Sequence, residues 1–143
     1  GEGEGGGGGG GEGSGEWGHS PCKELEMVKP HEQLEAWKFA MQLAKAVYEL
    51  TASFPVEERY GLAQQMRRAA VSIPSNLAEG AGRNGAKEFF HFIGMSRGSL
   101  AELETQMQLA LMLGYTTADH AAFALAERTG KLFTGLHKKW SNA

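Results

Sequence analysis

The chain has 143 residues, a length typical of a single domain. Charged residues make up 22% of the chain and the formal net charge is −3, so the sequence is neither strongly basic nor strongly acidic. No run approaches the roughly eighteen apolar residues of a membrane-spanning helix. The single cysteine, Cys22, excludes an internal disulfide and is typical of a protein of the reducing cytoplasm.

Most of the glycine lies in the first eighteen residues, a stretch without apolar periodicity. We predict a disordered Gly/Glu-rich tail over residues 1–26 and a folded domain over residues 27–143. The tail has neither a basic start nor an apolar run, so it lacks the features of a signal peptide. The native product is expected to start at Met27, a hypothesis that its intact mass would test.

The tail also masks the charge of the domain that follows it. Residues 1–26 hold six glutamates and one lysine. Residues 27–143 therefore carry thirteen Lys and Arg against eleven Asp and Glu, a net charge of +2. The predicted domain is mildly basic, which permits an anionic partner without requiring one.

Apolar residues recur at helical spacing in four segments, so we predict helices over residues 31–53, 56–80, 86–113 and 117–140. Thr116 is the expected N-cap of the last helix, with Asp119 completing an approximate capping box. The connections are short and no segment shows a strand pattern. The predicted fold is therefore all-α, an antiparallel up-down four-helix bundle.

Each helix has a predicted buried stripe. The first helix has two, Leu34-Trp37-Met41-Ala44-Tyr48 and Ala36-Ala40-Leu43-Val47-Leu50, so either both lie inside the bundle or one contacts another subunit. The stripes of the other helices are Leu62-Met66-Ala69-Ile73-Leu77, Phe89-Ile93-Ser96-Leu100-Leu103-Met107-Ala110 and Leu125-Thr129-Leu132-Leu136-Trp140. Gly94 and Gly98 lack a Cβ, and we expect another backbone to pack closely there.

A structural motif occupies the second half of the second helix, with Ser72, Pro74, Asn76, Glu79 and Gly80 as its members. Pro74 should bend or loosen the helix, because it lacks an N–H and clashes with the preceding turn. Serine and asparagine side chains can satisfy the carbonyls that it frees. Glu79 is expected to pair with an arginine such as Arg68 or Arg83. We favour this structural role over catalysis.

Basic residues are the candidate nucleic-acid contacts: Arg67, Arg68, Arg83, Lys87, Arg128, Lys131 and Lys138. They would hold phosphates by charge without reading bases. The alternative is a solvated surface without a ligand. On it the basic residues of the last helix only stabilise the C-terminal end of that helix, where positive charge is favourable.

Sequence motifs for catalysis or metal binding are absent. Glu88 and His91 resemble half of a di-iron site, but the second pair and two further glutamates are missing, and His91 should point away from the core. His19 and Cys22 supply two ligands where a structural zinc site needs four. No nucleophile motif or phosphate loop is present. We predict a non-enzymatic protein without a metal or other cofactor.

The sequence resembles the 23S rRNA-intervening sequence protein family of bacterial four-helix bundles. The matching residues are Trp37, Tyr48, and residues 54–55, 60–62, 65–80, 88–89, 98–100, 102–103 and 113–115. The resemblance implies a homo-oligomer, with a ring-shaped pentamer as the known assembly. A related branch, the accessory protein of diversity-generating retroelements, forms a pentameric barrel that binds nucleic acid and partners a reverse transcriptase.

Two functions follow from the residues and the resemblance together. The first is a cytoplasmic, ring-forming accessory protein that binds RNA or DNA through its basic residues. The second is a protein-interaction scaffold that binds no nucleic acid, its partner being a reverse transcriptase or another protein. A bundle enzyme is poorly supported, because no polar groups converge in the pattern.

Overall fold

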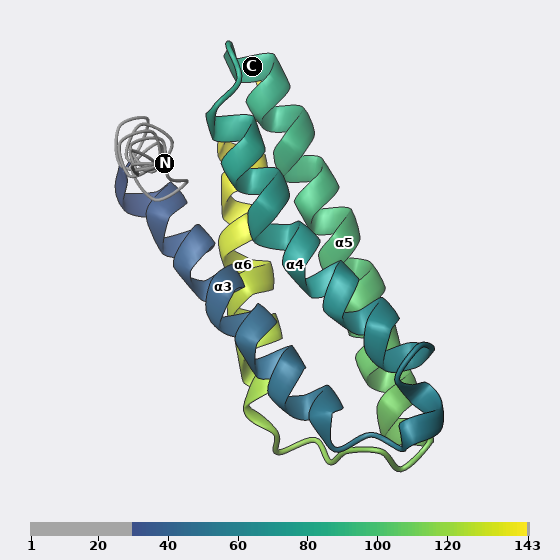
Figure 1. Ribbon diagram of the computed structural model, residues 1–143. Coiled ribbons are helices and arrows are strands. Elements are labelled where there is room, and N and C mark those ends of the chain that lie inside the picture. Colours follow the sequence, from purple (N-terminus) through teal and green to yellow (C-terminus); the bar gives the residue numbers. More distant parts are fainter. Residues whose placement is uncertain (1–29, 143) are drawn as a thin grey trace, which may run out of the picture.

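Figure 1 shows the computed structural model, which describes residues 30–142. The predicted tail and the proposed start at Met27 lie outside the described residues. The described residues form four α-helices, and their bounds are Pro30–Ala52 (α3), Leu62–Ala81 (α4), Ala86–Met112 (α5) and Ala121–Lys139 (α6). The predicted all-α, antiparallel up-down four-helix bundle is confirmed.

Each helix packs against two others, in the order α3–α4–α5–α6 and back to α3. Successive helices run in opposite directions (Figure 1). We call the end with the α4–α5 turn and the C-terminal end of α6 the head. The opposite end, with the α3–α4 and α5–α6 connections, is the foot. Among the described residues, no helix is both long and apolar enough to span a bilayer.

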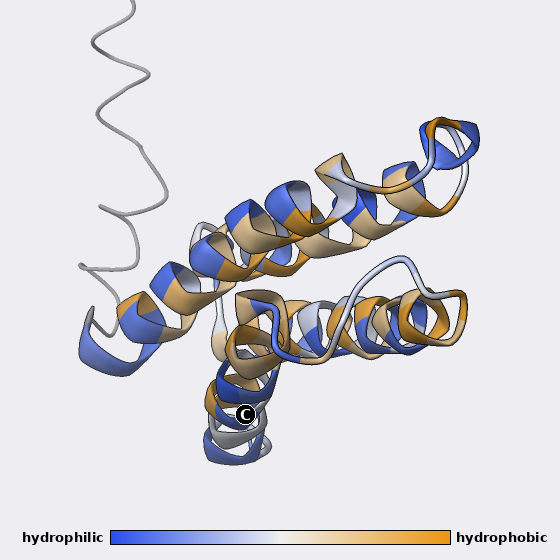
Figure 2. Cartoon of the chain, turned by 90° about the horizontal axis from the view of Figure 1, so that it is seen from below, coloured by the Kyte–Doolittle hydropathy of each residue, from blue (hydrophilic) through white to orange (hydrophobic). Residues whose placement is uncertain are grey.

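The helices are amphipathic, and each shows both hydrophilic and hydrophobic colours in Figure 2. Every member of the predicted stripes of α4 and α5 is buried, which confirms both. In α3 the whole stripe from Ala36 to Leu50 is buried. In the other stripe Ala44 is buried, whereas Met41 and Tyr48 are 45% and 47% exposed. The bundle therefore uses one of the two apolar faces of α3 and leaves part of the other in solvent.

The start of α4 differs from the prediction. A short 3₁₀ helix, η1 (Val56–Glu58), follows Pro55, and the α-helix begins only at Leu62. The Leu62 N–H donates to Glu58 Oε1 at 3.0 Å, so a carboxylate satisfies one of the N–H groups that a helix start leaves free. The helix propensity of the residues after Pro55 did not indicate that the α-helix starts only at Leu62.

The start of α6 also differs. Its N-cap is His120, whose Nδ1 accepts the Ala122 N–H at 3.0 Å, so the prediction of Thr116 as the cap was wrong. Thr117 Oγ1 donates to Asp119 in the loop before the cap. Along α6 the aromatic ring at the centre of the core belongs to Phe133, which is fully buried, while the predicted Leu132 is half-buried.

Helix α4 continues through Pro74, and the residues on both sides of the proline are helical. Ser72, Ser75 and Asn76 donate to the carbonyls of Ala69, Val71 and Ser72 at 2.7, 2.8 and 2.9 Å. A proline frees the carbonyl four residues before it, here that of Ala70. The side chains thus bond carbonyls on both sides of the freed one rather than that carbonyl itself, which corrects the predicted role.

Glycine also packs differently from the prediction. A Cβ on Gly94 or Gly98 would meet nothing within 4 Å, so the expected close approach there was wrong. The close approach is at Gly80, where a Cβ would lie 2.6 Å from Phe92 Cβ and 3.2 Å from Phe89 Cδ1. Gly80 therefore sets the distance between α4 and α5 at the head.

Candidate nucleic-acid interface

The seven predicted basic residues do not form one patch. Arg67 and Arg68 lie in the first half of α4, toward the foot, whereas Arg83 and Lys87 flank the turn at the head. Thirteen helical steps separate Arg68 from Ala81, where α4 ends just before Arg83, and they correspond to about 20 Å along the helix axis. The remaining three residues lie along α6.

At the head, carboxylates offset the charge of Arg83. Its Nη2 lies 2.6 Å from Glu79 Oε2, and its Nη1 lies 3.8 Å from Glu88 Oε1. The hydrogen bond and charge of Glu79 raise the pKa of Arg83, with a smaller contribution from Glu88. The predicted pairing of Glu79 with Arg83 is confirmed. Lys87 is exposed and forms no ion pair within the described chain.

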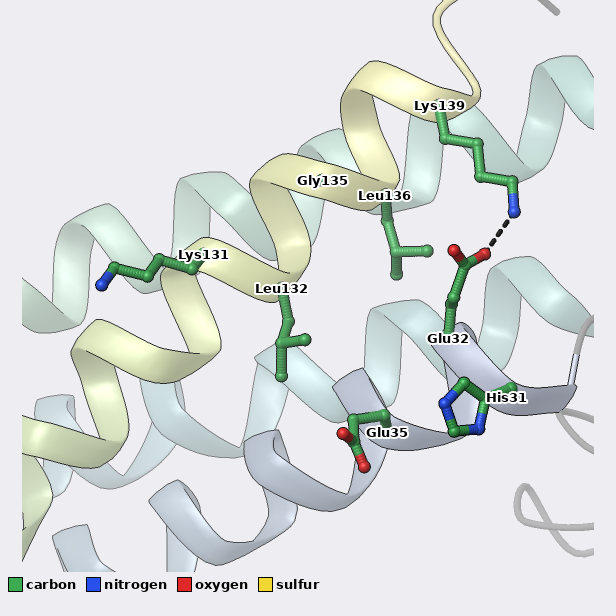
Figure 3. A pocket seen from close by; sticks show the side chains of 8 residues that line it. All are labelled: His31, Glu32, Glu35, Lys131, Leu132, Gly135, Leu136 and Lys139. Carbon is green, nitrogen blue, oxygen red and sulfur yellow. Dashed lines mark hydrogen bonds and ion pairs between the residues drawn. The ribbon is translucent and has the colours of Figure 1, made fainter.

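Along α6, glutamates of α3 reach the basic residues. Arg128 lies 3.9 Å from Glu35 and 5.3 Å from the centre of the Phe39 ring. Lys139 contacts Glu32 at the edge of a hollow of about 330 Å³ between α3 and α6 (Figure 3). Figure 3 shows Lys131 extending away from the two glutamates, at the far end of this hollow.

The C-terminal end of α6 packs through aromatic side chains. The His137 ring stacks on Phe90, with centroids 4.5 Å apart, and the Trp140 ring meets Phe89 edge-on at 4.8 Å. Burial lowers the pKa of His137, and the positive charge of Arg97 lowers it further. This lowered pKa favours the neutral form of His137 beside Lys138.

A third location gathers arginines without carboxylates. A hollow of about 670 Å³ lies toward the foot along the seam between α3 and α4, and we call it the foot hollow. Its lining residues are Tyr48, Arg59, Tyr60, Gln64, Arg67, Arg68, Val71, Ser72 and Ser75. Three of the nine are arginines and none is acidic, so the local charge is positive.

Arg67 is held in place by α3. Its Nε donates to Thr51 Oγ1 at 2.8 Å, and its Nη2 donates to the Tyr48 carbonyl at 3.3 Å. Its guanidinium carbon lies 4.6 Å from the centre of the Tyr48 ring. Thr51 in turn donates to the Val47 carbonyl at 2.8 Å. These contacts use only part of the five guanidinium N–H donors, and they fix the charge at the wall of the foot hollow.

Sequence reasoning found Arg67 and Arg68 but missed Arg59, Tyr60 and the exposure of Tyr48. The available signal was the adjacent basic and aromatic pair at positions 59 and 60, between Pro55 and the stripe of α4. Tyr48 belongs to an apolar stripe of α3, and its spacing fits a face buried inside the bundle as well as one that contacts another subunit.

The described residues contain no group of three or more His, Cys, Asp or Glu side chains that could hold a metal ion. His91 is exposed, as predicted, and its ring lies 5.6 Å from that of Phe92. His19 and Cys22 lie outside the described residues.

Comparison with known proteins agrees with the fold. Residues 32–134, most of the four helices, match the family described as 23S rRNA-intervening sequence protein. Comparison with curated proteins gives no match. Because the family match covers well over half of the sequence, the chain belongs to the 23S rRNA-intervening sequence protein family.

Proposed function

We propose that this protein is a non-enzymatic accessory protein of the cytoplasm that assembles into a homo-oligomeric ring, a pentamer, and binds nucleic acid through its basic side chains. One observation carries the proposal: three arginines line the foot hollow and no carboxylate does. Arginine donors suit phosphate oxygens, and uncompensated positive charge attracts the nucleic-acid backbone.

The predicted contacts divide into stronger and weaker candidates on this basis. Arg68 and Arg67 belong to the foot hollow. Lys87, Lys131 and Lys138 are exposed and extend the basic surface along other faces. The charges of Arg83 and Arg128 are shared with glutamates, so they contribute less to phosphate binding.

A ring requires each subunit to present two different surfaces that fit together. The first candidate, which we call the seam patch, lies along α3 and α4 toward the head and lines a hollow of about 310 Å³. Its residues are Trp37, Met41, Ala44, Val71, Pro74, Ser75 and Ala78. The second is at the foot end of α5, where Leu109, Met112 and Leu113 are exposed at helical spacing. Each copy would place its seam patch against the α5 end of the next.

A protein-interaction scaffold is the second candidate function, and the seam patch favours it. Met41 and Val71 of this patch are 45% and 42% exposed, and exposed apolar side chains mark protein interfaces. A scaffold would use this surface for another protein, such as a reverse transcriptase, and would leave the basic residues in solvent.

The binding experiment measures the fluorescence anisotropy of a labelled mixed-sequence single strand, as RNA and as DNA, at two salt concentrations. Three phosphate contacts predict that a fourfold rise in salt weakens binding roughly twentyfold. Arg68→Ala should weaken binding, whereas Lys45→Ala removes the same charge from an exposed site outside the foot hollow and should have less effect. Absence of binding at low salt would overturn the proposal and leave the scaffold as the leading function.

A further inference from the structure

We propose that the foot hollow binds an unpaired base of a single-stranded nucleic acid, stacked on Tyr60, while Arg59 and Arg68 hold the flanking phosphates. This inference rests on the proposed function and deepens it. A general basic surface would bind any polyanion, whereas a stacking site distinguishes a strand that carries free bases.

The first observation is the exposure of Tyr60. The residue is 81% exposed, and the described residues provide no ring partner and no side-chain hydrogen bond for it. The residue lies in the connection just before α4, next to Arg59. An exposed aromatic ring beside an arginine is the arrangement that single-strand binding proteins use for base stacking.

The walls of the foot hollow are the second observation. Arg67 covers one side of the Tyr48 ring and is fixed there by its bonds to α3. Its position is therefore set before a ligand arrives, and less conformational entropy is lost on binding. Arg59 and Arg68 are exposed and have no ion pair within the described chain, so their guanidinium groups are available to phosphates.

The polar lining is the third observation. The hydroxyls of Ser72 and Ser75 donate to helix carbonyls, which leaves their oxygens as acceptors. Gln64 offers both a donor and an acceptor. A hollow of about 670 Å³ lies within the usual size range of small-molecule sites, and these groups suit the edge of a base. In a duplex that edge is paired, so the proposal favours single strands.

The test compares three probes of the same length in fluorescence anisotropy: a mixed-sequence single strand, an abasic strand with the same phosphates, and a duplex. The wild-type protein is expected to bind the strand with bases about tenfold more tightly than the abasic strand. Tyr60→Ala should remove this ratio, and Tyr60→Phe, which keeps the ring, should retain it. Because Tyr60 is exposed, both variants should unfold at the wild-type temperature.

Arg59→Ala is the matched charge control. It should weaken binding of the intact strand and the abasic strand by the same factor, because both carry the same phosphates. Equal wild-type affinity for these two strands, or tighter binding of the duplex, would overturn the stacking site while leaving nucleic-acid binding in place. Failure to bind any of the probes at low salt would instead remove the proposed function itself.

Discussion

At the scale of single residues, Glu58 joins the two connections at the foot. One carboxylate oxygen accepts the Leu62 N–H at the start of α4, and the other accepts the Tyr115 hydroxyl at 2.9 Å. The Tyr115 ring also lies 5.1 Å from that of Phe54. A negative charge at a helix N-terminus is favourable in addition to these bonds. Glu58 therefore positions the segment that presents Arg59 and Tyr60.

This arrangement predicts a pH-dependent contribution to stability. The Leu62 N–H and then the Tyr115 hydroxyl lower the pKa of Glu58, so its folded pKa lies below its unfolded value. The stabilisation is complete above the unfolded pKa, about 4.3, and is lost as the pH falls through the lowered folded value. Glu58→Gln should therefore unfold at lower denaturant concentration than wild type at pH 7, with a gap that closes below about pH 4.

The measurement is guanidinium unfolding of both proteins at a series of pH values. Glu57→Gln serves as the control. Glu57 is exposed, and the hydrogen bonds to Leu62 and Tyr115 are made by Glu58 instead. A difference between wild type and Glu58→Gln that stays constant from pH 7 to pH 3 would contradict this account.

At the scale of helices, the clearest stripes predicted the core best. In α5 the spacing alternates between three and four residues along the whole predicted stripe, and each of its members is buried. In α6 the neighbours Leu132 and Phe133 are both apolar and lie 100° apart on a helix, so periodicity alone does not select between them. The face of α3 that enters the core depends on where α4 and α6 pack, which a single helix pattern does not contain.

At Gly80, helix packing reverses the stabilisation that alanine usually gives when it replaces a glycine within a helix. Gly98→Ala adds a methyl group with nothing within 4 Å and should stabilise the protein by about 0.5–1 kcal/mol through helix propensity. Gly80→Ala gains the same propensity but places a Cβ 2.6 Å from Phe92 Cβ. That atom is attached directly to the α5 backbone, so the helices must separate, and we expect a net loss of about 1–3 kcal/mol.

Thermal and denaturant unfolding of the two glycine variants and of wild type measures both changes in stability. The free energy of unfolding should rise in Gly98→Ala and fall in Gly80→Ala. If Gly80→Ala is as stable as Gly98→Ala, then α4 and α5 do not approach each other as closely as the structure has them.

At the scale of the whole molecule, the charge pattern is what the sequence predicted least well. Arg128 and Glu35 are 93 residues apart, and only the packing of α6 on α3 brings them together. The foot hollow is assembled in the same way, from Tyr48 of α3, the connection that carries Arg59, and the first half of α4. The basic residues themselves could be found from the sequence, but whether each faces a carboxylate or an open surface depends on the tertiary arrangement.

Assembly is the property that most affects these surfaces, because a ring would repeat the foot hollow once per subunit. Met41 lies in the seam patch and is 45% exposed in the single chain. Met41→Lys should leave the bundle folded, since the side chain is outside the core, but would place an unpaired charge in the proposed subunit contact. We expect the dissociation concentration of the oligomer to rise at least about tenfold.

Light scattering after size-exclusion chromatography, over a range of protein concentrations, measures this shift directly. Gln42→Lys is the matched control, because it adds the same charge at the next position of α3, on an exposed polar site outside the seam patch. An oligomeric wild type and Gln42→Lys, with a dissociated Met41→Lys, would place the subunit contact on the seam patch. If the wild type is monomeric at every concentration, the ring is wrong; if both variants assemble like wild type, the contact lies on another face.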